Sequence, residues 1–423
     1  MKGGEGTTVL HDRVPGGMFD LAGGALELRG IPDGARTNPL VATADALRLA
    51  GRLDLGGATQ AVTITPANGD NLFYGGFELV NGTINLTASG YVMPRGDMTI
   101  GAGGVLNIPG ANGKTQGSFC MSMPAVGDTM RLTIKDGGEL NEHSLWDNAY
   151  IGDGTCAKAI VEVSNNGFYH VDSHSTELGL NGCTGIIHGE GGRIDFNSYH
   201  KLFMVGRGGG EAHVALTNTW FLAGFIFGGH DRTETFPARS NADFEMVGGT
   251  LKIQGFVVRN INSWEARLDG VQIDNMVDNA DFFNCSIYAG ANDPFVLGPG
   301  GITFLNAHET GITTSLAGPG GVTVNGGTFT VSKDQKYTGT TTIKNGTRLA
   351  AAGRSFAGPV VFESGATFES PELPQGRTSV RVMGAPSFTG VDMKTRDPEG
   401  NHYFYEAGWL MYGQRPGFFL ILR

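Results

Sequence analysis

The chain has 423 residues, of which 69 are glycine and 17% are charged, and its formal net charge at pH 7 is −11. Glycine is roughly twice as frequent as in average proteins. The negative charge argues against nucleic acid and anionic membrane surfaces as partners, because both bind basic faces. No apolar run reaches the roughly 18 residues of a membrane-spanning helix. The apolar content of 40% is enough for a packed core, so we do not expect disorder.

The N-terminal residues 1–22 lack the apolar segment of a secretory signal peptide, and the first copy of a repeated phrase follows at residues 23–28. We expect the chain to be a fragment or a mature region of an exported protein. Its predicted location is extracellular or on the cell surface, with the export signal outside this chain. The alternative is a cytoplasmic protein that begins at Met1.

The repeated phrase consists of Gly-Gly or Asn-Gly, one variable residue, and an apolar–polar–apolar triplet. Its clearest copies occupy residues 23–28, 81–86, 103–108, 191–196, 248–253 and 326–331. The phrase anchors Gly82, Gly104, Gly138, Gly167 and Gly192 follow one another at unequal intervals. Alternation with a period of two predicts a strand with one buried face, and the glycine before it predicts a tight corner. Irregular intervals around a constant phrase indicate strands joined by loops of varying length.

Strands at this spacing, without helical periodicity between them, predict an all-β fold. We expect a single right-handed parallel β-helix of about 13–15 irregular rungs, where a rung is one coil of the chain. The β-helix is predicted over residues 1–370, although the rungs within residues 254–320 are too degenerate to be placed. A propeller or a jelly roll would require more regular blades or hairpin turns.

Parallel stacking places the third residue after each anchor on one outward face. This position predicts a column that consists of Asp54, Asn85, Asn107, Asn141, His170 and Asp195. Stacked asparagines can hydrogen-bond along the column, and neighbouring acids can attract cations or sugar hydroxyls. The pair His170–Asp195 is the best local candidate for acid–base chemistry, and the alternative is a solvated polar face.

Histidines gather in one stretch of the chain, at positions 170, 174, 188, 200, 213 and 230. Zinc needs three or four converging ligands, and the intervals between these histidines match no regular multiple of a rung. We therefore expect no metal site and no cofactor.

Four aspartates, Asp269, Asp274, Asp278 and Asp281, lie close together in the sequence. Paired carboxylates carry out glycoside hydrolysis, and many polysaccharide-degrading enzymes are right-handed β-helices. The Asp-Asp, Gly-His-Gly and Arg-Ile-Lys elements of polygalacturonases are absent from the sequence. Loop residues of a non-catalytic β-helix are therefore the preferred interpretation.

The chain has four cysteines, and the spacing of two of them, Cys156 and Cys183, matches a repeat of glycines. Gly152, Gly179 and Gly206 follow one another at this same interval, so the two cysteines are predicted to be neighbours on successive rungs. Their expected Cα separation allows a disulfide, and the alternative is a stacked pair of thiols.

Residues 320–353 carry the most specific signature, with the matching residues Gly326, Gly327, Phe329, Tyr337, Thr338, Gly339, Thr340, Thr342, Ile343, Gly346, Thr347 and, one place late, Leu349. This segment resembles the autotransporter-associated β-strand repeat of large bacterial surface proteins. The resemblance covers about a tenth of the chain and implies a secreted right-handed β-helix passenger, often adhesive or a simple stalk. The sequence leaves no room for the family's membrane β-barrel translocator, so self-translocation is not implied.

Residues 371–423 differ in character and are rich in aromatic residues, which predicts a β-hairpin cap over the last rung. Taken together, the sequence predicts a surface scaffold without catalysis, adhesin- or stalk-like, with carbohydrate or extracellular matrix as its partner. One alternative is a polysaccharide lyase or glycoside hydrolase of the β-helix type. A second is a phage-fibre-like protein.

Overall fold

The computed structural model describes most of the chain, namely residues 7–10, 19–21, 25–28, 40–44, 47–49, 51–55, 57, 61–66, 71–74, 77–86, 92–95, 97–109, 120–123, 129–144, 148–154, 158–197, 202–207, 209–229, 240–259, 261–287, 293–305, 308–369 and 372–415. All regular elements in these ranges are strands, as the sequence predicts. The chain forms two compact units. Unit 1 comprises Met1–Ile253, Val258–Trp264 and Ile287–Ala289, and unit 2 comprises Gln254–Val257, Glu265–Ser286 and Gly290–Arg423.

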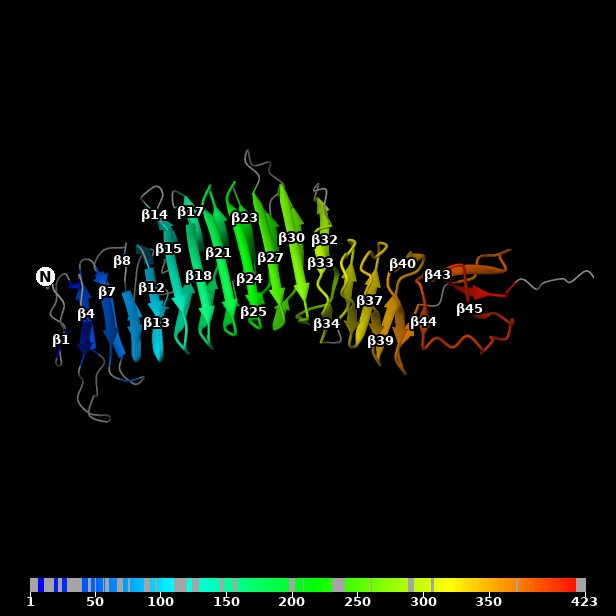
Figure 1. Cartoon of the computed structure of the whole chain (residues 1–423), viewed down its shortest axis with the longest axis horizontal. Helices are drawn as coiled ribbons and strands as arrows, with labels where there is room; N and C mark the ends of the chain where they lie inside the picture. Colours follow the sequence, from blue (N-terminus) through cyan, green and yellow to red (C-terminus); the bar gives the residue numbers. More distant parts are fainter. Residues whose placement is uncertain are drawn as a thin grey trace, which may run out of the picture. The chain divides into compact units, whose positions relative to one another are not determined.

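Unit 1 contains three parallel sheets whose strands lie side by side (Figure 1). Sheet 1 runs in the order β1 (Thr7–Leu10), β3 (Ala25–Leu28), β6 (Gly51–Asp54), β9 (Phe77–Val80), β12 (Asp97–Ile100), β15 (Thr129–Ile134), β18 (Lys158–Ser164), β21 (Thr184–Glu190), β24 (Glu211–Thr217) and β27 (Asn241–Val247). Sheet 2 runs in the order β4 (Leu40–Ala44), β7 (Ala61–Pro66), β10 (Gly82–Leu86), β13 (Gly104–Pro109), β16 (Glu139–Ser144), β19 (Phe168–Ser173), β22 (Arg193–Phe196), β25 (Trp220–Ala223) and β28 (Thr250–Ile253).

Sheet 3 of unit 1 runs in the order β14 (Cys120–Met123), β17 (Ala149–Gly154), β20 (Thr176–Leu180), β23 (Leu202–Arg207) and β26 (Phe225–Gly229). Two further parallel pairs are formed by β2 (Phe19–Leu21) with β5 (Leu47–Leu49) and by β8 (Asn71–Tyr74) with β11 (Val92–Arg95). Strand numbers within sheet 3 rise by three, as they do over most of sheets 1 and 2. Each coil of the chain therefore contributes one strand to each sheet, which is the arrangement of a β-solenoid.

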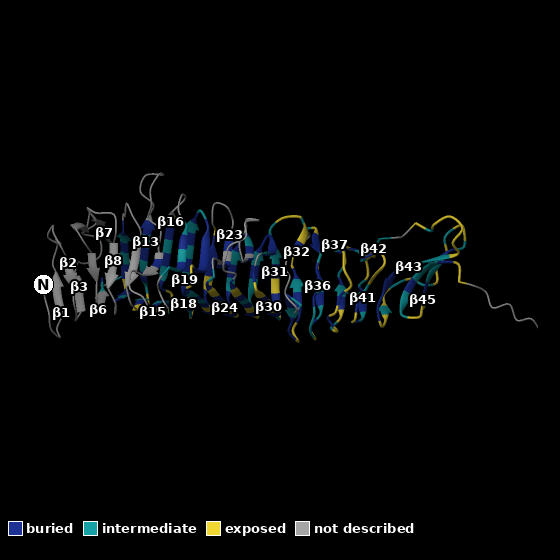
Figure 2. Cartoon of the chain, turned by 90° about the horizontal axis from the view of Figure 1, so that it is seen from above, coloured by how far each residue is buried: buried dark blue, intermediate teal, exposed yellow. Residues whose placement is uncertain are grey.

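The core of unit 1 consists of inward-facing columns that run across the strands. In sheet 1, Leu132, Val161, Ile187, Val214 and Phe244 pair in register and are all buried. Figure 2 shows buried residues along the strands and exposed residues mainly at the turns. Stacking of like apolar side chains on successive coils buries a continuous core, which a single coil cannot do alone.

The repeated phrase requires glycine for a steric reason. A Cβ atom on Gly138 would lie 2.3 Å from the carbonyl oxygen of Ile100 on the preceding coil, closer than atoms pack. The residue before the anchor adopts a left-handed conformation, with φ of 64° at Gly103 and 50° at Asn81. Asparagine is among the residues that tolerate this conformation best, which explains why Asn-Gly and Gly-Gly exchange in the phrase.

Unit 2 contains parallel sheets with shorter coils. One sheet runs in the order β31 (Val271–Asn275), β34 (Ile302–Phe304), β36 (Val322–Val324), β38 (Thr341–Ile343), β41 (Val360–Phe362) and β44 (Phe388–Thr389). Another runs in the order β32 (Asn279–Ile287), β35 (Thr310–Ile312), β37 (Gly327–Val331), β39 (Thr347–Ala350) and β42 (Thr367–Phe368). β30 (Ser263–Asp269) pairs with β33 (Phe295–Leu297), and the chain passes between the units several times, once within β29 (Gly255–Arg259).

Residues 320–353 belong to the regular part of unit 2. Val322, Thr341 and Val360 pair in register, and each comes from one of three successive coils. Tyr337 is fully buried, and its hydroxyl group lies 2.6 Å from Thr341 Oγ1. Burial raises the pKa of Tyr337 above its ordinary value, so the phenol stays protonated.

The last strands of unit 2 form a mixed sheet in the order β40 (Arg354–Ser355), β43 (Ser379–Gly384), β46 (Trp409–Gly413) and β45 (His402–Glu406). β45 and β46 pair antiparallel and are joined by a short turn. The predicted boundary between residues 370 and 371 stays a prediction, and Phe418 and Phe419 of the predicted cap lie outside the described residues.

Candidate functional site

The outward face of sheet 2 brings together five of the six residues of the predicted column. Asn85, Asn107, Asn141, His170 and Asp195 pair in register on five successive strands, from β10 to β22. Their positions follow from strand pairing, because each phrase contributes its third residue to the same side of the sheet.

Asp54 is not part of this column. It lies on β6 of sheet 1, where it pairs with Glu27 and Val80. Its carboxylate accepts hydrogen bonds of 3.2 and 3.3 Å from Asn81 Nδ2. The repeated phrase begins strands of two different sheets, so an equal position in the phrase does not guarantee an equal face of the coil.

The three asparagines form a hydrogen-bonded ladder. Asn107 Nδ2 donates to Asn85 Oδ1 at 2.9 Å, and Asn141 Nδ2 donates to Asn107 Oδ1 at 3.0 Å. Their amide groups therefore stabilise the stacking of coils and leave less capacity for a ligand. We assign this half of the column a structural role.

The other half of the column consists of His170 and Asp195, whose side chains are largely shielded from solvent. The His170 Nδ1 atom lies 3.4 Å from Asp195 Oδ2, and the two side chains are only 17% and 10% exposed. His170 Nδ1 and Asp195 Oδ1 are buried and form no hydrogen bond among the described residues. Arg193 contacts the same carboxylate, with its Nη2 atom 3.3 Å from Asp195 Oδ2.

Arg193 lies between two aromatic rings of neighbouring strands. Its guanidinium carbon is 4.8 Å from the ring centroid of Phe168 on β19 and 4.1 Å from that of Trp220 on β25. Cation–π contacts of this kind hold the arginine in place beside Asp195. The arginine is exposed and the two aromatic residues are half-buried, so part of each faces solvent.

His143 and Asp172 form a second row on the outward face of sheet 2, beside His170 and Asp195. They pair in register on β16 and β19, two residues beyond Asn141 and His170. His143 Nδ1 lies 3.7 Å from Asp172 Oδ2, and the His143 and His170 ring centroids are 5.3 Å apart. The sequence prediction missed this row, although the fifth residue after the anchors Gly138 and Gly167 would have found it. We call His143, Phe168, His170, Asp172, Arg193, Asp195 and Trp220 the sheet 2 patch.

Among the described residues, the other histidines of the cluster do not join this patch. His213 forms an ion pair with Asp243 on the outward face of sheet 1, and His174 Nδ1 lies 3.2 Å from Asn148 Oδ1. His200 and His230 lie outside the described residues.

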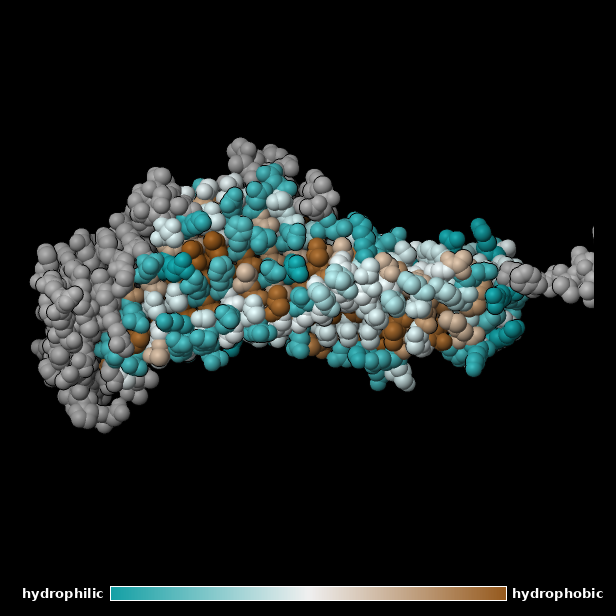
Figure 3. All heavy atoms as spheres, in the orientation of Figure 1, coloured by the Kyte–Doolittle hydropathy of each residue, from teal (hydrophilic) through white to brown (hydrophobic). Residues whose placement is uncertain are grey.

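A groove of about 480 Å³ lies on the outward face of sheet 1, across β18, β21 and β24. Its lining includes Glu162, His188 and Glu190, together with Ala215 and Thr217. Glu162 is already engaged, because it forms an ion pair with Arg131 and accepts a hydrogen bond of 3.3 Å from Thr133. Figure 3 shows apolar side chains among hydrophilic ones over the visible face of unit 1.

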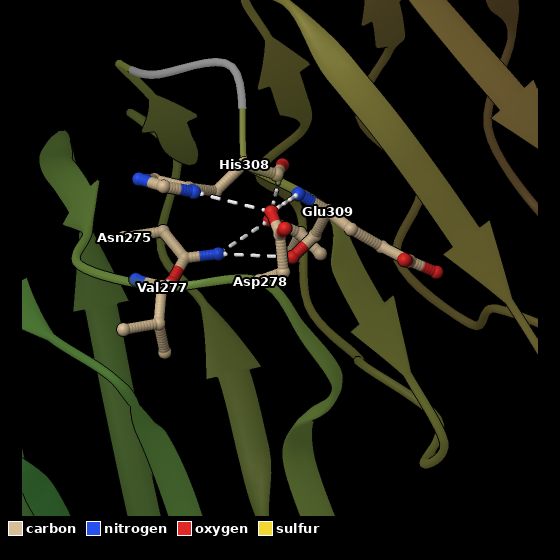
Figure 4. Close-up of polar contacts among 6 residues, drawn as sticks. Asn275, Val277, Asp278, His308 and Glu309 are labelled. Atoms are coloured by element: carbon tan, nitrogen blue, oxygen red, sulfur yellow. Dashed lines mark hydrogen bonds and ion pairs between the residues drawn. The ribbon is translucent and has the colours of Figure 1, made fainter.

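Two of the four aspartates between residues 269 and 281 bind backbone amides of unit 2. Asp269 Oδ1 accepts a hydrogen bond of 2.6 Å from the Gly300 amide, and Asp278 Oδ1 accepts one of 2.8 Å from the Glu309 amide. Figure 4 shows Asp278 directed toward Glu309 and His308, whose Nδ1 atom is 3.1 Å away. These hydrogen bonds, the backbone bond first, lower the pKa of Asp278. A carboxylate held ionised by the next coil is a turn element rather than a general acid.

The neighbouring Asn275 is fully buried, and its side chain connects the same two coils by hydrogen bonds. Its Nδ2 atom donates to Thr310 Oγ1 at 2.9 Å and to the Glu309 carbonyl at 3.2 Å (Figure 4). Asp281 and Asp274 lie on the strands that flank this turn, β32 and β31.

Cys183 is fully buried and takes part in a disulfide. Cys156 lies outside the described residues, so its pairing with Cys183 stays a prediction. Cys285 is a free cysteine, and burial raises the pKa of its thiol to about 12. A thiol with this pKa is a poor nucleophile at neutral pH.

Comparison with protein-family models, with curated proteins and with solved structures finds no match. Within the described residues there is no helix long and apolar enough to cross a membrane.

Proposed function

We propose that the chain is an exported β-helix scaffold that displays a carbohydrate-recognition surface on the outward face of sheet 2. The observation that carries this proposal is the division of that face into two halves. The asparagines are used between the coils, whereas the sheet 2 patch gathers polar and aromatic groups, of which Arg193 and His143 are exposed and Phe168 and Trp220 are half-buried.

The chemistry of the sheet 2 patch suits a sugar. Trp220 and Phe168 offer partly exposed rings for the apolar face of a pyranose, and Arg193, His143 and Asp172 offer hydrogen-bonding groups for its hydroxyls. Repetition along the stacked coils would allow several weak contacts with one polymer, which raises the overall affinity. An extracellular matrix protein is the competing partner class.

Export is supported by the disulfide at Cys183, because disulfides persist in oxidising compartments and are rare in the cytosol. The low charged fraction and the negative net charge are also compatible with an extracellular scaffold. The resemblance of residues 320–353 to the autotransporter-associated repeat supports a passenger, and with it a single right-handed coil of about 13–15 rungs.

A C-terminal cap is the second architectural part of this proposal. Tyr403 of β45 packs on Phe368 of β42 with ring centroids 4.8 Å apart, and Phe404 and Leu410 are buried. These contacts support a cap of antiparallel strands against the last coil of unit 2, where a solenoid needs its open edge covered.

A glycan array with the intact chain tests the binding proposal. We expect retention of acidic or neutral polysaccharides, and loss of at least about tenfold in affinity for Trp220→Ala, since stacked aromatics dominate such contacts. Trp409→Ala is the matched control, because Trp409 also packs against an arginine, Arg381 at 4.8 Å, but lies on β46. Binding only to matrix proteins, or equal loss in both variants, would contradict the proposal.

An enzyme of the polysaccharide lyase or hydrolase class is the second candidate, because the groove on sheet 1 contains Glu190 and His188 beside Glu162. Paired carboxylates in a groove are what glycoside hydrolysis requires. Reducing-end and unsaturated-product assays on the polysaccharides retained by the array decide between the two. Turnover that is lost in Glu190→Gln would replace the scaffold proposal with this one.

A further inference from the structure

We propose that His143, His170 and Asp172 form a binding site for a divalent transition-metal ion of the zinc class. One ligand atom from each of these residues lies within 4.8 Å of the other two. Two imidazoles and a carboxylate are a common ligand set for Zn²⁺ in proteins. The site lies within unit 1 and shares His143 and Asp172 with the proposed carbohydrate surface, but metal binding is measured without any carbohydrate.

The three ligands come from two adjacent strands of one sheet. His143 is on β16, and His170 and Asp172 are on β19, with the His143–Asp172 pair in register and Asn141 opposite His170. Hydrogen bonds of a parallel sheet hold these backbones in place, so only side-chain rotations are needed to bring the ligand atoms to metal-binding distance. Sites on strands are held more precisely than sites on loops.

A second observation concerns the ring nitrogen of His170 that faces away from solvent. This Nδ1 atom is buried, lacks a hydrogen bond among the described residues and lies 3.4 Å from the carboxylate of Asp195. Histidines that bind a metal through one nitrogen almost always donate the other N–H group to a carboxylate, a backbone carbonyl or water, which fixes the tautomer. Asp195 is in the position of such a carboxylate, and metal binding at Nε2 would leave the His170 Nδ1–H group to donate to it.

Asp195 is in turn held by Arg193, which packs between Phe168 and Trp220. We therefore assign Asp195 the role of a positioning residue for His170. His143 is 49% exposed and Asp172 is 30% exposed, so the outer side of the site is open to water. Water would complete the coordination, as in zinc sites with three protein ligands.

The test is titration of the full chain, freed of metal with a chelator, with Zn²⁺ and with Co²⁺. We expect one Zn²⁺ per chain, and a visible d–d absorption band from bound Co²⁺ that Zn²⁺ abolishes. His143→Gln should abolish this stoichiometric binding. The His143 side chain is exposed, so we expect the variant to fold. His213→Gln, which removes a histidine from the aspartate pair on sheet 1, should bind like the wild type.

Asp195→Asn should keep the stoichiometry and weaken Zn²⁺ binding by about 10–100-fold. It should also shift the pH at which half of the metal is released, which a purely structural role would not change. No stoichiometric binding by the wild type, or unchanged binding in His143→Gln, would overturn the proposal. Circular dichroism of every variant verifies that the coils are intact.

Discussion

Single polar residues at the ends of strands join one coil to the next. Asp54 accepts from Asn81, Asp269 from the Gly300 amide and Asp278 from the Glu309 amide, in each case on a neighbouring strand or turn. Asp269 and Asp278 accept from backbone amides and so replace water at the turns, where the sheet ladder ends, whereas Asp54 accepts from a side-chain amide. The acids of these turns are thus explained without catalysis.

Asp278 makes the stability of unit 2 dependent on pH. Its lowered pKa means that folding favours the ionised form, so the stabilisation is complete above the ordinary carboxyl pKa of about 4. It is lost as the pH falls through the folded-state pKa. The melting temperature of the wild type should therefore exceed that of Asp278→Asn at pH 7 and approach it in strong acid. Asp281→Asn controls for the loss of one charge, and a difference independent of pH would refute the explanation.

Gly138 tests the steric reason for the repeated phrase. Gly138→Ala should lower the melting temperature by an amount that corresponds to about 1–3 kcal/mol, because the added Cβ would lie 2.3 Å from a carbonyl oxygen of the preceding coil. Gly57→Ala should have little effect, since no atom of the described residues lies within 4 Å of its Cβ position. Thermal denaturation monitored by circular dichroism compares the two variants. Equal effects would show that the close approach is not what requires glycine.

At the scale of elements, the register between neighbouring strands determines which outward-facing side chains are adjacent. The alternation in each phrase predicts the strands and their inward faces, and register then makes neighbours of Asn141, His170 and Asp195. Asp54 could not be excluded from that row by sequence, because strands of sheets 1 and 2 begin with the same phrase. His143 and Asp172 could have been found, since they only require the phrase to extend two residues further.

Other parts of the chain could not be predicted because their phrases are degenerate. Between β32 and β35 the register shifts between Asn279 and Phe283, so no constant interval links the coils there. The contact between Arg193 and Trp220 cannot be predicted from the sequence, because it depends on the pairing of their two strands. Pairing, rather than composition, creates the sheet 2 patch.

The asparagine ladder predicts coupling between coils. Asn107→Ala removes one donated and one accepted hydrogen bond and should cost about 1–3 kcal/mol. The double variant with Asn141→Ala should cost less than the sum of the single variants, because both remove the bond between them. Chemical denaturation of the four proteins measures the coupling energy. Strict additivity would mean that the ladder contributes nothing to stacking.

At the scale of the molecule, the two units differ in how many strands a coil contains. In most of unit 1 a coil contributes to three sheets, and Val161, Ile187 and Val214 mark three successive coils. A coil in the regular part of unit 2 contributes to two sheets. The paired residues Val322 and Thr341 of two successive coils there lie closer together in the sequence than the paired residues Val161 and Ile187 of unit 1. Shorter coils surround a smaller core, so each coil of unit 2 buries fewer inward side chains.

Removal of the predicted cap tests its role. A chain that ends at Glu369 loses β43, β45 and β46 together with β44, and it leaves Phe368 without its contact to Tyr403. We expect this chain to aggregate in a concentration-dependent manner, because an uncovered strand edge pairs with other chains. Light scattering and size-exclusion chromatography provide the readout, with a chain that ends at Arg415 as control. A truncated chain that stays monomeric would contradict the capping role.

The stacking in unit 1 also has an evolutionary consequence. In the described strands of unit 1, each coil pairs with the coils before and after it, so its stability depends on nearest neighbours. A substitution on the outward face of β22 therefore leaves a distant strand such as β10 unaffected. Ligand preference can change one coil at a time while the inward columns stay the same. Such a surface can diversify by small steps, each of which preserves a folded protein.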